Sequence, residues 1–207
     1  MSQKLHRLWS NFTLFTYSLS LHREYLTTIL HLTKANMMDE LKYILNYNQQ
    51  LKDQVRVMIA KNKLKNYLLG KYKTSHNITT DKALYNYIDQ FKKEYFKKSA
   101  PLTKAKFDSK IDIIHNALGT HHFISKVQGK KLKSKNEIYI ASIFKNLPSE
   151  FLTMIVVHEL SHFKQKEHNK AFYNMCQYIY EPYHQVEFDL RLYLTYRDLN
   201  GKIEEWS

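Results

Sequence analysis

The segment from Glu150 to Lys164 has apolar residues at helical spacing and contains neither glycine nor proline. Leu147-Pro148 comes just before it. Proline fits the first turn of a helix, because the backbone N–H that it lacks would have no partner there. The pattern therefore predicts an amphipathic helix with a wide apolar face.

Helical spacing also dominates the first hundred residues. Asp39–Lys63 is predicted to be a helix that continues through Leu64–Leu69, with Gly70 as its end. The run Thr79-Thr80-Asp81 offers N-caps to a second helix, which ends before Ala100-Pro101. We therefore expect a helical N-terminal half.

The middle of the chain favours strands. Lys110–His115, His121–Val127 and Glu137–Phe144 are short, rich in β-branched or aromatic residues, and separated by glycine-containing turns. They predict a small, mostly antiparallel sheet and hence the α+β class. Glu137–Phe144 is the candidate for an edge strand that receives an extended substrate by β-augmentation, although it would equally serve as a core strand.

Two further elements are expected after the helix at Glu150–Lys164. Lys164–Glu167 is charged enough to form an exposed corner, and Asn169 can cap a helix over Lys170–Tyr180 that Pro182 ends. In His184–Leu199 apolar residues alternate as in a strand. The length of this segment without glycine or proline nevertheless favours a helix.

Length and composition suggest one domain with an appended segment. The chain has 207 residues, of which 43% are hydrophobic. Residues 1–36 lack a helical stripe and are rich in serine, threonine and aromatic residues, so we treat them as an extension that lies outside the domain or packs on it as an arm. Residues 37–207 are predicted to form a single domain.

The sequence indicates a cytoplasmic protein. Its one cysteine, Cys176, cannot form an internal disulfide, which favours a reducing compartment, and its apolar neighbours favour a core position. No run of 18 or more apolar residues is present, which excludes a membrane span. The sequence does not predict an oligomeric state.

The formal net charge is +13. Such a charge can attract nucleic acid, nucleotides or acidic substrates, or it can simply keep a surface solvated. A lysine cluster precedes the Glu137–Phe144 strand and allows the same two interpretations: it consists of Lys126, Lys130, Lys131, Lys133 and Lys135.

The chemistry of the chain centres on the motif His158-Glu159-x-x-His162. Residues four apart share one face of a helix, so both imidazoles can bind one metal ion. Catalytic zinc usually has three protein ligands and one open position, and His168 is a ready third ligand. Glu159 would act as the general base on a metal-activated water. The pattern predicts a Zn²⁺-dependent hydrolase, with the peptide amide as the first substrate to consider.

Other candidate residues are less specific. Tyr183 and His184 follow the third histidine and could stabilise an oxyanion, or they could be a packed pair at a helix start. As substrate-binding candidates we take Lys131 and Lys133 from the lysine cluster. Tyr139 and Ala141 are the corresponding candidates from the adjacent strand.

These residues resemble a known family. Met154–Tyr173 is similar to the signature H-E-L-x-H-x5-H-x3-F of the YgjP-like metal-dependent hydrolases. The resemblance extends to four other stretches, which are Thr80–Tyr85, Asn116–Gly119, Lys126–Gly129 and Tyr183–Asp189. It implies a minimal zincin-like fold with the active helix under a small sheet. It also implies His158, His162 and His168 as zinc ligands and Glu159 as catalytic base.

The resemblance leaves the substrate open. Members of the family are described as metallopeptidase-like, and a nucleoside triphosphate pyrophosphatase role, for example on UTP, has also been attached to it. Where the wider family often carries Trp-Gly-Ser-Cys, this chain has Lys131–Lys135, so contacts from that stretch cannot be carried over. We therefore keep three hypotheses: a metallopeptidase, a nucleotide pyrophosphatase, and a nucleic-acid-associated protein with a structural metal.

Overall fold

The computed structural model describes residues 41–111, 119–128 and 131–206, and for 119–135 it describes the backbone only. The chain divides into two compact units, residues 1–45 and 46–207. In the first unit the described part contains the short 3-10 helix η1 (Lys42–Ile44). The extension predicted for residues 1–36 lies outside the described residues. All further description concerns the second unit.

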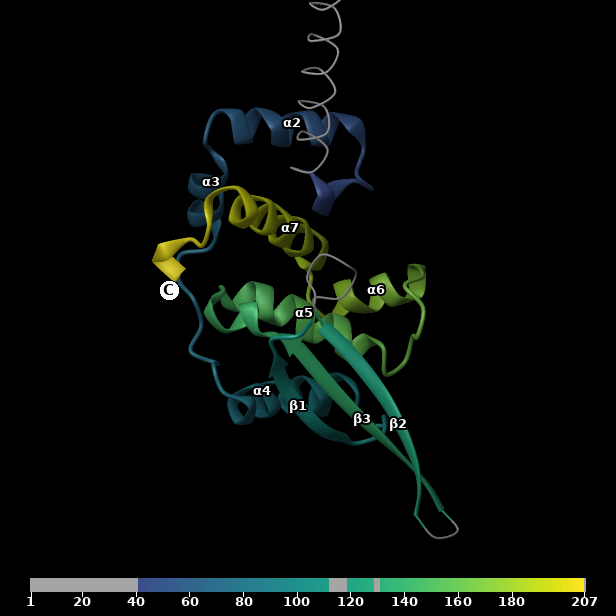
Figure 1. Cartoon of the computed structure of the whole chain (residues 1–207). Helices are drawn as coiled ribbons and strands as arrows, with labels where there is room; N and C mark the ends of the chain where they lie inside the picture. Colours follow the sequence, from purple (N-terminus) through teal and green to yellow (C-terminus); the bar gives the residue numbers. More distant parts are fainter. Residues whose placement is uncertain (1–40, 112–118, 129–130, 207) are drawn as a thin grey trace, which may run out of the picture. The chain divides into compact units, whose positions relative to one another are not determined.

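The second unit combines helices with one small sheet (Figure 1). Its helices, in chain order, are α2 (Gln49–Ala60), α3 (Leu64–Lys71), α4 (Asp81–Tyr95), η2 (Ser142–Asn146), α5 (Ser149–Ser161), α6 (Lys170–Ile179), α7 (Tyr183–Asn200) and η3 (Glu204–Trp206). Its strands are β1 (Leu102–Asp108), β2 (Gly119–Gln128) and β3 (Lys131–Ala141). Among the described residues, no helix has the length and apolar character that a membrane crossing requires.

Most predicted helices are present, and side-chain caps set where they begin. Thr80 accepts a hydrogen bond from Ala83 N at the start of α4, and Asn169 accepts one from Phe172 N at the start of α6. Both caps were predicted. The segment 184–199 is helical, as its length without glycine or proline indicated.

The long N-terminal helix was predicted with wrong limits. Regular α-helix begins at Gln49, where the Asn48 side chain caps α2, and not at Asp39. The helix is then interrupted at Asn62, whose φ of 52° lies in the left-handed region. Gly70 does not end the second piece, since α3 continues to Lys71.

The sheet is mixed rather than mostly antiparallel. Its strand order is β1-β3-β2, with β3 antiparallel to β2 and parallel to β1. The sequence pattern does not predict β1, because its alternation of lysines with apolar residues follows directly after the helix-ending Ala100-Pro101. The strand predicted at 110–115 falls largely outside the described residues.

β3 lies in the centre of the sheet, so the prediction that Glu137–Phe144 forms an edge strand is wrong. Residues 137–140 pair with β1 on one side and with β2 on the other. Their backbone groups therefore already have partners, and an extended substrate cannot add to this strand. β3 also ends at Ala141, after which the chain forms η2 instead of continuing to Phe144.

Helix α5 is the centre of the core. Nine of its residues are buried, and they cover its whole circumference rather than one face: Phe151, Leu152, Met154, Ile155, Val156, Val157, Glu159, Leu160 and Ser161. The helix lies between the sheet and α7 and packs against α4, α6, α7, β2 and β3 (Figure 1). The predicted amphipathic helix is thus a buried one.

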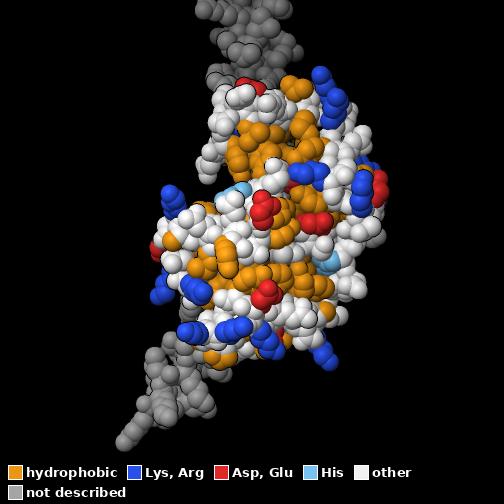
Figure 2. Space-filling view, turned by 180° about the vertical axis from the view of Figure 1, so that it is seen from behind, with side chains coloured by type: hydrophobic (Ala, Val, Ile, Leu, Met, Phe, Trp, Pro, Cys, Tyr) orange, Lys and Arg blue, Asp and Glu red, His pale blue; other side chains and the backbone are white. Residues whose placement is uncertain are grey.

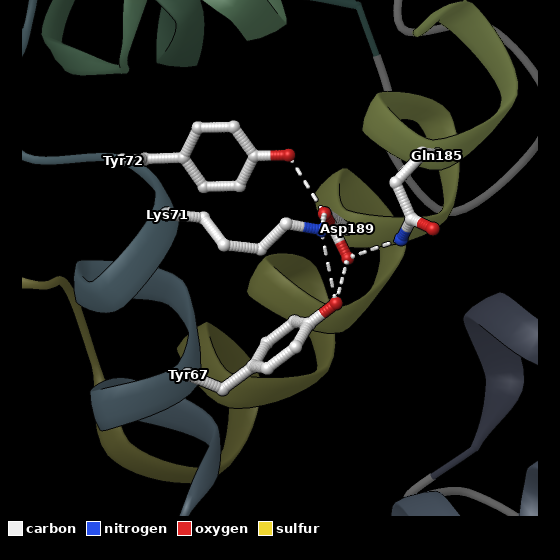
Figure 3. Close-up of polar contacts among 5 residues, drawn as sticks. All are labelled: Tyr67, Lys71, Tyr72, Gln185 and Asp189. Carbon is white, nitrogen blue, oxygen red and sulfur yellow. Dashed lines mark hydrogen bonds and ion pairs between the residues drawn. The ribbon is translucent and has the colours of Figure 1, made fainter.

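Helices α3 and α7 are joined by a polar cluster around Asp189, whose side chain is fully buried (Figure 3). Tyr67 Oη and Gln185 Nε2 donate hydrogen bonds to Asp189 Oδ1, at 2.8 and 3.0 Å. Tyr72 Oη and Lys71 Nζ donate to Oδ2, at 2.7 and 2.5 Å. Four donors compensate for the removal of the carboxylate from water, so the cluster fixes α7 against α3.

We predict that Asp189→Ala lowers the free energy of unfolding by about 3 kcal/mol or more, because the buried hydroxyl of Tyr72, the half-buried hydroxyl of Tyr67 and the ammonium of Lys71 lose their acceptor. Urea unfolding followed by circular dichroism measures this. Glu205→Ala serves as the control, since its ion pair with Lys65 is exposed and its loss should change the free energy of unfolding far less. Equal losses in both variants would contradict the structural role of Asp189.

Candidate metal centre

The three predicted histidines come together at the end of α5. His158 lies in the last turns of this helix, His162 is its C-terminal cap, and His168 directly precedes the cap of α6. One ring nitrogen from each histidine lies within 4.8 Å of the others. The chain turns between α5 and α6, where Gln165 N donates to Ser161 O, and this turn brings His168 back. The exposed corner predicted at 164–167 forms it.

The spacing of the ring nitrogens suits one metal ion. Nε2 of His158 and Nε2 of His168 are 3.1 Å apart. Two imidazoles on one tetrahedral zinc ion, each with a bond of about 2.0–2.1 Å, would place their nitrogens roughly 3.3 Å apart. The three histidines therefore fit a single ion and leave a fourth position open to water or substrate.

The second nitrogens of two of the rings are held by the protein. His158 Nδ1 lies 2.7 Å from the Tyr183 hydroxyl, and His162 Nδ1 lies 3.0 Å from the backbone oxygen of Gln165. A proton on each Nδ1 can be donated to these oxygens, which leaves Nε2 with its lone pair for a metal. The backbone oxygen of Gln165 can only accept, so it selects this tautomer of His162, and the Tyr183 hydroxyl can accept from His158 in the same tautomer.

Phe172 forms an apolar floor beneath the three rings. Its ring centroid lies 4.9 Å from that of His158, 4.7 Å from His162 and 4.8 Å from His168. The side chain is fully buried and comes from the first turn of α6. It restricts the rotation of all three imidazoles and excludes water from one side of the site.

Burial favours the neutral form of two of these histidines. It lowers the pKa of His158 to about 3 together with the charges of His162 and His168. The pKa of His162 is also lowered, mainly by burial. A neutral imidazole is the form that coordinates a metal, so the chemistry of the three side chains fits the group.

Glu159 is a buried carboxyl group beside this cluster. It is 2% exposed and forms no hydrogen bond or ion pair with the described residues. Burial raises its pKa to about 8. A carboxyl group with such a pKa can exchange a proton near neutral pH, which is the property that a general base requires.

Cys176 also contacts this region but is not a reactive group. Its Sγ lies 3.3 Å from the hydroxyl of Ser161, and the side chain is fully buried. Burial raises the pKa of the thiol to about 11, so it stays protonated at neutral pH. This agrees with the core position expected from its neighbours.

Of the two speculative catalytic residues, Tyr183 is buried and His184 is exposed. Tyr183 is fully buried, and its hydroxyl is bonded to His158, so it holds a candidate ligand instead of facing a substrate. His184 is exposed, and its ring packs on Tyr173 and Tyr183 at 5.7 and 5.4 Å between centroids. The packed pair described as an alternative is therefore present.

The speculative substrate-binding residues are not gathered at the histidines. The side chains of Lys131 and Lys133 lie outside the described residues. Tyr139 Oη accepts a hydrogen bond from Lys104 Nζ and donates one to Glu137, and Ala141 is buried at the end of β3. No contact between Tyr139 or Ala141 and the three histidines is seen in the described part of the chain.

Sequence reasoning missed a charged pair next to the site. Arg191 and Glu187, one turn apart on α7, form an ion pair of 2.7 Å. The positive charge of Arg191 contributes to the lowered pKa of His158, so the guanidinium lies within electrostatic range of the metal centre. The spacing of the two residues suggests only a surface pair, because sequence does not show which face of α7 meets α5.

We predict that Tyr183→Phe weakens metal binding by about 10- to 100-fold, because His158 loses the partner of its Nδ1. Competition with a chromophoric chelator measures the affinity. Tyr173→Phe is the matched control, since that ring lies 6.3 Å from His168 between centroids but forms no hydrogen bond with a described residue. Unchanged affinity in Tyr183→Phe would show that the contact does not orient a ligand.

Comparisons with known proteins identify the family of the chain. A family model described as a YgjP-like metallopeptidase domain matches residues 30–193. A protein named UTP pyrophosphatase from Escherichia coli (strain K12) is 48% identical over 158 residues, which cover 76% of this chain and 95% of that protein. No solved structure matches the chain. The chain therefore belongs to the YgjP-like family of metal-dependent hydrolases.

Proposed function

We propose that the chain hydrolyses nucleoside triphosphates such as UTP to the monophosphate and pyrophosphate. The observation that carries the proposal is the 48% identity with the UTP pyrophosphatase across 95% of that protein. The three-histidine cluster and the buried Glu159 supply groups that such a hydrolysis can use. The alternative substrate of the sequence analysis thus has better support than a peptide.

His158, His162 and His168 would hold the metal ion, and we propose zinc, which three imidazoles suit. When bound, the ion would polarise the attacked phosphoryl group and the attacking water. Glu159 accepts a proton from that water while the oxygen of the water forms a bond to the α-phosphorus. The bond from this phosphorus to the bridging oxygen breaks, and pyrophosphate leaves with the bonding electrons.

Arg191 lies within electrostatic range of this centre, because its charge contributes to the lowered pKa of His158. A guanidinium suits the recognition of phosphate oxygens. We include it in the proposal as a contributor to triphosphate binding.

A metallopeptidase is the second candidate, favoured by the description of the matching family model. The central position of β3 removes the edge strand that was expected to receive a peptide. A peptide would therefore have to bind elsewhere in the unit. Assays of the same variants with nucleotides and with peptides distinguish the two candidate substrates.

The nucleic-acid-associated hypothesis has less support. Figure 2 shows lysine and arginine side chains mostly along the rim of the pictured face, while hydrophobic side chains fill its centre. A purely structural metal would have four protein ligands, whereas the described residues gather three histidines. The set of three ligands favours a catalytic site over a structural one.

We expect Glu159→Gln to lower kcat for UTP by about 100- to 10,000-fold while the metal content stays unchanged, because only the proton acceptor is lost. UTP and a peptide library are assayed side by side with wild type and variant, and pyrophosphate release is quantified. If peptides are cleaved in a Glu159-dependent manner and UTP is not, the pyrophosphatase proposal is wrong. A fully active variant would exclude Glu159 as the base.

We expect His158→Ala and His168→Ala each to lose most of the bound metal and of the hydrolytic activity, because two imidazoles cannot replace a set of three. Inductively coupled plasma mass spectrometry of the purified chain identifies and counts the metal. His184→Ala is the control, since its exposed ring is outside the cluster. Full metal content in His158→Ala would show that the assignment of ligands is incorrect.

A further inference from the structure

A cavity lies at the opposite end of α7 from the metal centre. It has a volume of about 310 Å³ and is lined by the end of β1, by η2, by the last turns of α7 and by the residues that follow them. Arg197, in its wall, comes fourteen positions after Tyr183, which corresponds to about 21 Å along the helix. The cavity is therefore distinct from the site of the three histidines.

The fold directs several hydrogen-bond donors toward this cavity. Tyr193 and Arg197 are one turn apart on α7 and both line it. Gly201, whose φ is 85°, ends the helix and turns the chain, so that Lys202 also lines the cavity while Ile203 is buried. Asn146 of η2 contributes an amide from the other wall.

These donors have no partners in the described part of the chain. The Tyr193 side chain is 3% exposed, yet its hydroxyl forms no hydrogen bond there. The guanidinium of Arg197 and the ammonium of Lys202 likewise form no ion pair with a described residue. An anion in the cavity would supply these donors with acceptor oxygens.

The charges in the wall favour an anion. Arg197 and Lys202 are opposed by one acidic residue, Asp108, whose Oδ1 already accepts a hydrogen bond of 2.8 Å from Lys110 N. Burial raises the pKa of Tyr193, so its hydroxyl remains protonated and can donate. Two cations and a phenol match the several acceptor oxygens of a phosphate group.

We propose that this cavity binds a small phosphate-bearing anion through Tyr193, Arg197 and Lys202. Its volume lies at the lower end of the range for ligand sites, about 300–1,000 Å³, so a ligand of the size of inorganic phosphate or pyrophosphate fits. The site does not depend on the proposed function of the metal centre. It would add a second anion site to the chain.

Isothermal titration of the metal-loaded full chain with inorganic phosphate and with pyrophosphate tests the proposal. We expect binding that falls at least tenfold in Arg197→Gln/Lys202→Gln and severalfold in Tyr193→Phe, a change that removes only an oxygen without a protein partner. Lys73→Gln/Lys98→Gln removes the same charge from exposed positions and should bind as wild type does. Thermal unfolding verifies that the variants fold.

Two further arms separate this cavity from other sources of binding. His162→Ala, which alters the metal centre, should retain the titration, whereas its loss there would place the anion at the histidines. Succinate tests for a carboxylate ligand, and binding of succinate without binding of either phosphate would overturn the proposal. The proposal would also be overturned if neither phosphate nor pyrophosphate bound to the wild type. It would be overturned too if Arg197→Gln/Lys202→Gln and Lys73→Gln/Lys98→Gln lost binding to the same extent.

Discussion

Three imidazoles must point at one position, but one helix can supply only two of them. Hydrogen bonds to the Nδ1 atoms of two of the rings fix the orientation of these imidazoles. Tyr183 on α7 holds Nδ1 of His158, and the backbone oxygen of Gln165 holds Nδ1 of His162. The first contact requires α7 to begin beside the end of α5. The second requires the turn after α5 that also returns His168, so the packing of three helices follows from the needs of the site.

The cluster around Asp189 belongs to the same arrangement. It lies six residues after Tyr183 on α7 and joins this helix to α3 with four hydrogen bonds. Tyr183 is the first residue of α7, so the direction of the helix axis determines where its hydroxyl lies. Residues distant from the histidines therefore contribute to their geometry. The aromatic contacts of Tyr72 and Trp206 with Phe151 extend this support to the chain's last helix, η3.

The sequence was sufficient for the parts of the structure that depend on local patterns. The spacing of His158 and His162, the caps at Thr80 and Asn169, and the helix over 184–199 all follow from residues close together in the chain. The pairing of strands was not predictable in this way. β1 and β3 are parallel neighbours although about thirty residues separate them, and a pattern of alternation does not state which strand lies at an edge. For the same reason the sequence did not reveal the role of Tyr183, the position of Arg191 near the metal centre, or the lining of the cavity at the other end of α7, because each depends on contacts between distant elements.

The burial of α5 around its whole circumference has a consequence for how the protein can change over evolution. A helix with a solvent face can accept substitutions there without loss of stability, and its functional residues can vary separately from its core. Here Glu159 shares the helix with eight other buried residues. Variation in the chemistry of this enzyme is consequently expected to arise on α6, α7 and the loops around them, while the sequence of α5 stays nearly fixed.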